Sequence, residues 1–79
     1  MTGDHTTRVD AVVESVAGRR PDDPAAAWST LGMDSLDLLT LITSVEDEFD
    51  VRISDSEAAA LHNPADVVAL ISRLREPIA

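Results

Sequence analysis

Residues 34–49 read DSLDLLTLITSVEDEF, and this stretch gives the strongest structural signal in the chain. Its apolar residues recur at intervals of three and four, which is the spacing of one face of an α-helix. Asp34 has a side chain suited to the N-cap of that helix, and Asp37 lies at the third helical position. The stretch therefore predicts a helix that begins after Asp34 and buries one face. The residues of that face are Leu38, Leu41, Ile42, Val45 and Phe49.

An earlier segment predicts a second amphipathic helix. Thr7 is positioned to cap it, with Asp10 three residues later, and Gly18 is positioned to end it. A long connection then runs from Pro21 to Asp34, and we expect its apolar residues to fold back over the core. The helix buries a stripe formed by Val9, Val12, Val13 and Val16, and the connection contributes Trp28, Leu31 and Met33.

Two more helices are expected towards the C-terminus. A short one is expected around Ser56 to Leu61. Asn63 and Pro64 then form a strong helix start, because asparagine caps well and proline suits the first helical position. Pro77 is expected to end this last helix. Its buried stripe is predicted to be Val67, Val68, Ile71 and Leu74.

These elements together predict an all-α fold. It is a small four-helix bundle of three longer helices and one short helix, with a long loop between the first two helices. Because 79 residues allow one small domain, residues 1–79 are expected to form a single domain. We expect residues 1–5 and 76–79 to be flexible termini. Met1 and the lack of linker composition favour a free-standing protein, and we expect a monomer.

The charge balance excludes several classes of function. Fifteen acidic residues stand against six basic ones, all arginine, so the formal net charge is -9. Such a chain repels phosphate backbones and anionic membrane surfaces, and we expect basic protein partners rather than nucleic acid or membrane. Without cysteine there is no disulfide, thiolate metal site or thiol nucleophile. No segment has the pattern of a signal peptide or a membrane span, which predicts a cytoplasmic protein.

Ser35 is the sharpest candidate for chemistry, because it falls in the first turn of the predicted helix. There the backbone N–H groups lack intrahelical partners and the helix dipole is positive. A phosphate ester on Ser35 would therefore be attached at a site suited to anions. Gly32 allows a sharp turn just before it and keeps bulk away from the hydroxyl. The residues alone also allow a plainer interpretation, in which Ser35 is simply a good helix-start residue.

Other catalytic and metal chemistry has little support in the sequence. A serine hydrolase would need a base near Ser35, and the two histidines, His5 and His62, lie in no recognisable motif. We expect His5 in a frayed terminus and His62 in a loop. The acidic runs lack the order of a calcium-binding loop, and three glycines could hardly form a phosphate-binding loop. We therefore expect no catalytic residue and no metal ligand.

Three segments carry a resemblance to a known family. They are residues 31–37 (LGMDSLD), 45–50 (VEDEFD) and 53–58 (ISDSEA), followed by the capped last helix. With them the chain resembles the acyl carrier proteins, which are four-helix carriers with a phosphopantetheine arm on a serine. The resemblance implies that Ser35, between Asp34 and Leu36, is the attachment serine. A phosphopantetheinyl transferase would move the 4'-phosphopantetheine there from coenzyme A, and the thiol of the arm would carry an acyl group as a thioester.

The outward face of the second predicted helix is a candidate partner surface. Leu36 projects there with Thr40, Thr43 and Asp47, and an exposed leucine beside the modified serine could anchor an enzyme. Eight acids lie within residues 34–57, opposed in that segment only by Arg52. The helix dipole disfavours acids in its last turn, so recognition explains Glu46, Asp47 and Glu48 better than local stability does. The candidate partner-binding residues are Leu36, Asp37, Thr40, Thr43, Glu46, Asp47, Asp55 and Glu57.

The resemblance also suggests partners and a pathway. It implies docking on basic patches of the transferase, of a loading ligase or acyltransferase, and of a ketosynthase or other tailoring enzyme. Thr40 and Thr43 replace residues that are usually Glu and Met in fatty-acid carriers, and Arg52 interrupts a stretch that is usually acidic. These departures favour a polyketide, fatty-acid-like, antibiotic or other secondary-metabolite pathway over housekeeping fatty-acid synthesis.

Two alternatives stay open at this point. One is an aminoacyl or peptidyl carrier with the same serine chemistry, and the other is an unmodified acidic interaction module in which Ser35 only caps a helix. A carrier could also admit a short acyl chain between the second helix and its neighbours. The residues expected to line that space are Leu41, Val45 and Ile71.

Overall fold

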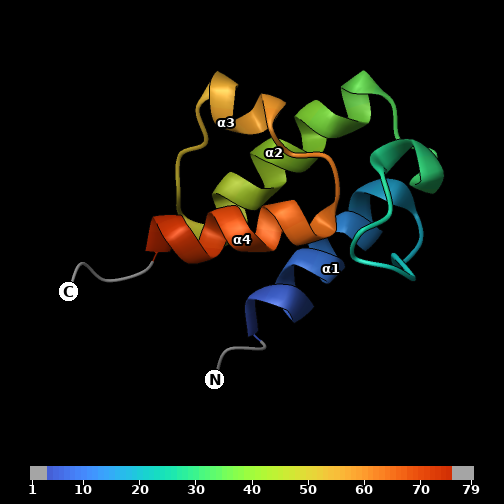
Figure 1. Cartoon of the computed structure of the whole chain (residues 1–79), viewed down its shortest axis with the longest axis horizontal. Helices are drawn as coiled ribbons and strands as arrows, with labels where there is room; N and C mark the ends of the chain where they lie inside the picture. Colours follow the sequence, from blue (N-terminus) through green and yellow to red (C-terminus); the bar gives the residue numbers. More distant parts are fainter. Residues whose placement is uncertain (1–3, 76–79) are drawn as a thin grey trace.

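The computed structural model describes residues 4–75, and this part of the chain is helical (Figure 1). In chain order the elements are α1 (Asp4–Ala17), the 3-10 helix η1 (Trp28–Leu31), α2 (Ser35–Phe49), α3 (Asp55–Ala59) and α4 (Pro64–Arg75). Residues 4–75 contain no strand. None of their helices is long and apolar enough to cross a membrane. The prediction of an all-α fold with three longer helices and one short helix is confirmed.

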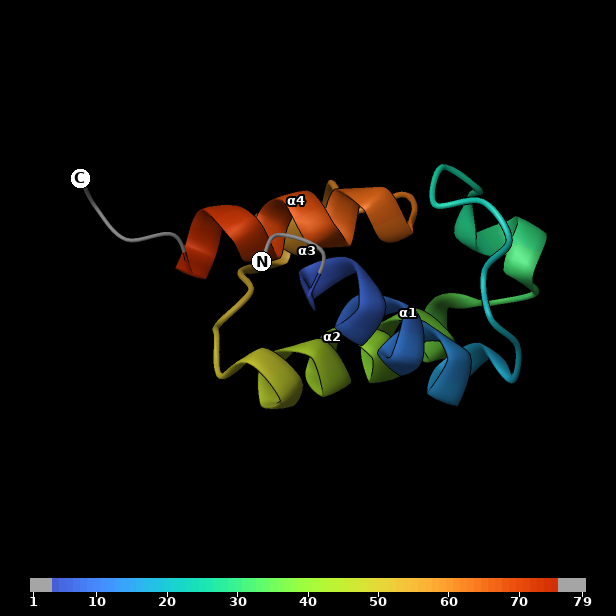
Figure 2. The ribbon, with the colours of Figure 1, turned by 90° about the horizontal axis from the view of Figure 1, so that it is seen from below.

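The three longer helices form the body of the molecule. Helix α1 packs against both α2 and α4 and lies between them when the ribbon is seen from below (Figure 2). The short α3 and the first turns of α2 form the upper edge in Figure 1, and α4 crosses below them. The start of α2 and the whole of α3 are therefore at the periphery of the bundle, where a partner can reach them.

One hydrophobic core joins the elements. Val16, Leu38, Ile42 and Val68, which were predicted to be buried, are partly buried and pack against it. Each fully buried aliphatic side chain stabilises the fold by about 1.5–3 kcal/mol relative to an exposed one. The side chains with almost no exposed surface are Val9, Val13, Leu41, Val45, Phe49, Pro64, Val67 and Ile71.

The buried face of α4 differs from the predicted face at two positions. Leu70 is 4% exposed and lies in the core, whereas Leu74 is 37% exposed. Leu70 follows Val67 by three residues, so nearly one helical turn brings both to the same side. Leu74 belongs to the last turn of α4, one turn beyond Ile71, and the helix ends at Arg75. The prediction of a buried Leu74 is therefore wrong, and Leu70 replaces it.

The long connection between α1 and α2 folds back over the core, as predicted. The Trp28 indole N–H donates a hydrogen bond of 3.0 Å to the carbonyl oxygen of Leu61. The N–H of Ala65, in the first turn of α4, donates to the carbonyl of Pro24 at 2.8 Å. These bonds fix the connection to the loop after α3 and to the first turn of α4, and they support η1, which the sequence pattern did not predict. The buried residues of the connection are Trp28, Leu31 and Met33.

The start of α1 differs from the prediction. The helix begins at Asp4, so Thr7 lies inside it rather than at its cap. His5, expected in a frayed terminus, packs edge-on against the ring of Phe49 with the ring centroids 5.8 Å apart. This aromatic contact gives a physical reason for the extra turn of helix before Thr7. The other expected flexible residues, 1–3 and 76–79, lie outside the described part of the chain, as does Pro77.

The start of α4 follows the sequence pattern. The Asn63 Oδ1 accepts the N–H of Asp66 at 2.8 Å, and Pro64 is the first helical residue. His62 is an exposed loop residue, as expected, and its N–H donates to the Asp66 carboxylate at 2.9 Å. Across residues 4–75, no group of three or more His, Asp or Glu side chains is arranged to hold a metal ion.

Candidate functional site at the start of α2

Helix α2 begins with a reciprocal pair of hydrogen bonds. The Asp34 Oδ1 accepts the N–H of Asp37 at 2.9 Å, and the Asp37 Oδ2 accepts the N–H of Asp34 at 3.1 Å. This capping box confirms the predicted N-cap. Both carboxylates therefore have a structural role, and together they fix Ser35 as the first residue of the helix.

Ser35 is exposed at the point where the chain turns from η1 into α2. Gly32 has a φ of +77°, in the left-handed region that glycine adopts without strain. Its N–H donates to the carbonyl of Ser29 at 3.0 Å, and the N–H of Met33 donates to the carbonyl of Trp28 at 3.1 Å. A Cβ atom at residue 32 would meet no atom within 4 Å. Glycine is thus needed here for its backbone conformation, not to keep bulk away as the sequence suggested.

The face of α2 next to Ser35 carries exposed apolar side chains. Leu36 is 72% exposed and Leu39 is 65% exposed. Thr40 and Thr43 are exposed as well, and the Thr40 hydroxyl donates to the carbonyl of Leu36 at 3.1 Å. The predicted outward position of Leu36 is confirmed. Leu39 was missed, because its exposure depends on how little of α2 the short α3 covers.

Two acids in the last turn of α2 have partners inside the protein. The Glu46 carboxylate accepts the N–H of Ile53 at 2.8 Å, which ties the loop after α2 back to the helix. The Glu48 carboxylate lies 3.2 Å from the guanidinium of Arg8 in α1. The expectation that these acids do not contribute to local stability is therefore wrong for Glu46 and Glu48. Asp47, between them, is exposed.

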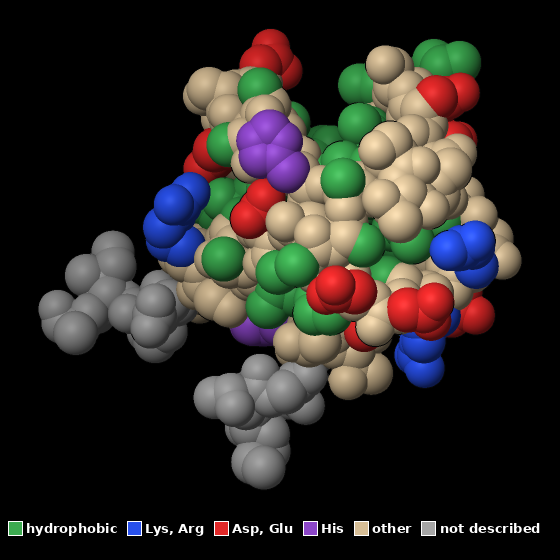
Figure 3. Space-filling model, turned by 45° about the vertical axis from the view of Figure 1, so that its right-hand side comes forward, with side chains coloured by type: hydrophobic (Ala, Val, Ile, Leu, Met, Phe, Trp, Pro, Cys, Tyr) green, Lys and Arg blue, Asp and Glu red, His purple; other side chains and the backbone are tan. Residues whose placement is uncertain are grey.

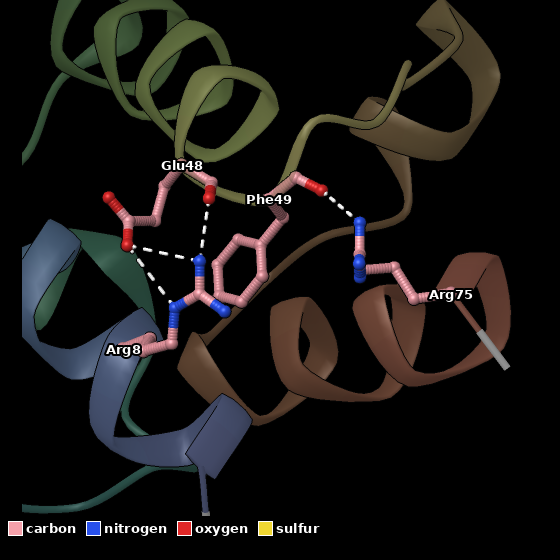
Figure 4. Close-up of polar contacts among 4 residues, drawn as sticks. All are labelled: Arg8, Glu48, Phe49 and Arg75. Atoms are coloured by element: carbon pink, nitrogen blue, oxygen red, sulfur yellow. Dashed lines mark hydrogen bonds and ion pairs between the residues drawn. The ribbon is translucent and has the colours of Figure 1, made fainter.

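Two arginines bind the carbonyl groups at the end of α2 (Figure 4). Arg8 from α1 donates to the carbonyl of Glu48 at 2.7 Å, and Arg75 from α4 donates to the carbonyl of Phe49 at 2.6 Å. The Arg8 guanidinium also lies 4.4 Å from the centre of the Phe49 ring. Cations are stabilising here, because the last carbonyls of a helix form the negative end of its dipole. Arg52 is the one base within residues 34–57, but Arg8 and Arg75 from other helices also bring positive charge to the acidic end of α2.

Helix α3 begins with a second capping box. The Ser54 N–H donates to the Glu57 carboxylate at 2.9 Å, and the Glu57 N–H donates to the Ser54 hydroxyl at 3.1 Å. The hydrogen bonds from Ser54, with a smaller contribution from the Arg73 guanidinium 3.8 Å away, lower the pKa of Glu57 below its ordinary value. The box starts α3 at Asp55, one residue before the expected Ser56, and α3 ends two residues earlier than expected. Glu57 is thus structurally engaged, whereas Asp55 is exposed.

An apolar groove of about 290 Å³ opens between α2 and α3. In the space-filling view, a cleft opens at the upper edge, and hydrophobic side chains lie in it and beside it (Figure 3). Leu41 lines the groove as expected, but Val45 and Ile71 are fully buried in the core and do not line it. The lining residues are Trp28, Leu38, Leu39, Leu41, Ile42, Asp55, Ala58, Ala59 and Leu61.

The chain is similar to one known family and to several known proteins. The family described as "Phosphopantetheine attachment site" matches residues 7–71. The acyl carrier protein of Campylobacter fetus subsp. fetus is 41% identical over 69 residues, which cover 85% of this chain and 90% of that protein. Acyl carrier proteins of Akkermansia muciniphila and Campylobacter curvus are 44% and 48% identical over 45 and 44 residues. These two matches cover 57% and 56% of this chain, and 56% and 57% of the respective relatives.

The family match extends from within α1 to within α4 and includes the start of α2. The helical bundle, the capped α2 and the exposed serine at its first residue agree with that match. The chain therefore belongs to the acyl carrier protein family, whose members carry covalently attached 4'-phosphopantetheine.

Proposed function

We propose that Ser35 bears the 4'-phosphopantetheine and that the protein delivers acyl groups between enzymes on this arm. The observation that carries the proposal is the exposed Ser35 side chain at the first residue of α2, within the segment that matches the attachment family. When bound, the arm supplies a thiol that holds an acyl group as a thioester. In this proposal the protein acts as a carrier, and the enzymes that load and receive the acyl group supply the catalysis.

The surroundings of Ser35 fit a phosphate diester. The N–H groups of the first turn have no preceding turn to bond to, and the positive end of the helix dipole lies there. The neighbouring carboxylates of Asp34 and Asp37 are each held by a backbone N–H in the capping box, which offsets part of their repulsion of a phosphate. We propose Asp34 and Leu36, which flank the serine, as the residues nearest to the bound arm.

A phosphopantetheinyl transferase is the partner that the attachment requires. The Ser35 oxygen forms a bond to the phosphorus that carries the pantetheine in coenzyme A, and the bond from that phosphorus to the bridging oxygen breaks. Adenosine 3',5'-bisphosphate leaves, and the transferase accepts the serine proton. The carrier's part in this step is to present an exposed hydroxyl at a helix end that the Asp34–Asp37 capping box holds in place, which favours its orientation towards the phosphorus.

The pathway proposed for this carrier is polyketide or other secondary metabolism, including antibiotic synthesis. Exposed Thr40 and Thr43 on α2, and exposed Arg52 after it, support this choice over a fatty-acid carrier. A ligase or acyltransferase would load the thiol, and a ketosynthase or tailoring enzyme would receive the acyl group. Basic patches on such enzymes would meet Asp47 and Asp55, which are exposed, more readily than Asp37, Glu46 and Glu57, which have internal partners. A cytoplasmic location stays a prediction.

The attachment is tested by the intact mass of the folded protein after incubation with coenzyme A, magnesium and a broad-specificity phosphopantetheinyl transferase. We expect an increase of one arm's mass in the wild type and in Ser56→Ala, which removes another exposed serine, but not in Ser35→Ala. An unchanged mass with several transferases, on protein that does not already carry the arm, would overturn the proposal. In that case the unmodified interaction module would be the better description.

A further inference from the structure

The histidine at the start of α1 has a buried nitrogen that nothing satisfies. The Nδ1 atom of His5 has almost no exposed surface and no hydrogen-bond partner. The ring instead contacts Phe49, the last residue of α2, at an interplanar angle of 72°. A buried polar atom without a partner costs free energy, so its presence in a folded protein calls for an explanation.

The surroundings of His5 disfavour a positive charge on its ring. His5 is the second residue of α1, where the positive end of the helix dipole lies. Arg8, three residues later on the same side of α1, holds its guanidinium 4.4 Å from the centre of the Phe49 ring. Arg75 brings a second guanidinium to the Phe49 carbonyl (Figure 4). Protonation of His5 would add a third positive charge around Phe49 and a buried N–H group without an acceptor.

The acids of the neighbouring helices are engaged or lie elsewhere. Glu48 already forms an ion pair with Arg8 at 3.2 Å. After its first turn α4 carries no acid, and its last turn is basic. Asp4 directly precedes His5, and successive helical residues do not face each other. More distant acids of α1 and α2 are Asp10 and Glu14, five and nine residues after His5 on other sides of the helix, and the exposed Asp47 and Asp50.

The sequence around His5 also provides a second start for α1. Thr7, with Asp10 three residues later, has the pattern of an N-cap. The helix nevertheless begins at Asp4, where the contact of His5 with Phe49 supports the additional turn. Without that contact, α1 can shorten to a start after Thr7 while the rest of the helix stays in the core. Two possible starts make this turn a two-state element.

We propose that residues 4–7 form a pH-sensitive latch at the start of α1. With neutral His5 the latch is closed and the imidazole packs on Phe49. Protonation of His5 opens it, because the charged ring is better accommodated in water, and α1 then begins after Thr7. An imidazole in water is half protonated at about pH 6.5, so falling pH shifts the population to the open latch in the mildly acidic range. Opening uncovers one edge of Phe49 and weakens the packing at the end of α2.

The first test measures how acid changes stability in two histidine variants. His5→Phe keeps an aromatic ring that takes up no proton, and His62→Gln removes the exposed loop histidine as the matched control. Urea denaturation between about pH 7.5 and 5.5, where carboxylates remain largely ionised, gives the unfolding equilibrium constants. The contribution of neutral His5 is complete at the upper end of this range and is lost towards the lower end.

We therefore expect the unfolding constant of the wild type, divided by that of His5→Phe, to rise about fivefold as the pH falls over this range. His62→Gln should keep the pH dependence of the wild type.

The second test follows the latch in the wild type by nuclear magnetic resonance. We expect the Cα chemical shifts of residues 5–7 to move from helical towards coil values with the same midpoint as protonation of the His5 ring. The ring resonances of Phe49 should move with them, whereas residues 10–17 should keep helical shifts. This measurement needs no variant, so it decides the matter even if His5→Phe folds poorly.

Four results would overturn the inference. One is a ratio of unfolding constants that stays within about 1.5-fold over the pH range. Another is a helical turn at residues 5–7 that persists when His5 is protonated. Loss of the pH dependence in His62→Gln would assign the effect to the loop histidine, and simultaneous loss of helix throughout α1 would show general unfolding instead of a latch. None of these results depends on modification of Ser35, so the latch and the proposed function stand or fall separately.

Discussion

Asp34 is a single residue that links the stability of the fold to the proposed attachment site. Its carboxylate accepts the N–H of Asp37, and its own N–H is accepted by the Asp37 carboxylate. The next residue is Ser35, so the same two hydrogen bonds fix the helix end that presents the serine. A change at Asp34 therefore acts on stability even though its side chain is exposed.

Loss of this cap is the first prediction. Asp34→Ala leaves the Asp37 N–H without its acceptor, and we expect the free energy of unfolding to fall by about 1 kcal/mol. For a domain of this size that corresponds to a melting temperature lower by about 4–8 °C. Urea denaturation and thermal melts measure both quantities. Asp47→Ala, an exposed acid of the same helix, is the matched control with an expected change below about 0.5 kcal/mol. Equal losses in the two variants would contradict a capping role for Asp34.

Local signals of this kind are the part of the structure that the sequence predicts well. Asp34 and Asn63 were recognised as caps because a cap and its third helical residue are close together in the chain. Ser54 followed by Glu57 gives the same signal and went unrecognised, which shifted the expected start of α3 by one residue. At Thr7 the local signal is misleading, because the contact of His5 with Phe49 extends α1 back to Asp4, beyond the expected cap.

At the scale of elements, the end of α2 is held from two sides. Arg8 from α1 and Arg75 from α4 donate to successive carbonyl groups of its last turn. These partners are 40 and 26 residues apart in the chain, so periodicity and capping patterns could not predict them. From the sequence alone, the helix dipole therefore favours recognition as the role of the terminal acids of α2. The same limit explains why Leu39 was missed, because its exposure depends on the position of α3.

The arginine contacts at the end of α2 give the second prediction. Arg8→Gln and Arg75→Gln are each expected to lower the free energy of unfolding by about 1 kcal/mol, since each removes a charged donor from a helix C-terminus. Arg20→Gln is the control, because the Arg20–Glu14 pair is 4.0 Å long and exposed. Its expected change is below about 0.5 kcal/mol in the same urea titration. A control as destabilising as either variant would contradict a specific role for these two contacts.

Helix α3 gives a prediction about pH. The pKa of Glu57 is lower in the folded than in the unfolded chain, because Ser54 and then Arg73 favour its ionised form. Ionised Glu57 therefore stabilises the fold above its unfolded pKa of about 4.5, and this contribution is lost as pH falls through the lower folded pKa. Glu57→Gln keeps the hydrogen-bonding shape and removes the charge.

We therefore expect the difference in unfolding free energy between wild type and Glu57→Gln to be constant above about pH 6 and to shrink towards about pH 3. Urea denaturation across this pH range measures it. Asp55→Asn, which neutralises the exposed neighbour at the first residue of α3, is the control. A difference for Glu57 that grows as the solution becomes more acidic would contradict a lowered pKa in the folded chain.

At the scale of the whole molecule, the main feature is the large negative net charge. A net charge of -9 on 79 residues gives strong self-repulsion in the compact state. The ion pairs of Arg8 with Glu48 and of Arg73 with Glu57 relieve part of it, but the acids outnumber the bases by more than two to one. A hydrophobic core is thus enclosed by a surface on which the negative charges repel one another.

Salt should therefore stabilise the protein as a whole. We expect the melting temperature to rise by several degrees between about 0.02 M and 0.5 M sodium chloride, over which the Debye length falls from about 20 Å to about 4 Å. Magnesium should act at lower concentration, because it screens and pairs with carboxylates more strongly. Calorimetry at fixed pH measures the shift. A flat titration would contradict the argument that self-repulsion limits stability.

The function proposed for the whole molecule is the transport of acyl groups on an arm at Ser35, and the state of Ser35 in the cells that make the protein tests it most directly. The chain would be isolated under conditions that preserve thioesters, digested, and the Ser35 peptide analysed by tandem mass spectrometry. We expect a 4'-phosphopantetheine on Ser35. Part of the population should also carry an acyl group on the arm, and hydroxylamine should release that acyl group by cleaving the thioester. The mass of that acyl group would also distinguish a polyketide-type carrier from an aminoacyl carrier. A Ser35 that is unmodified throughout would contradict the proposed function.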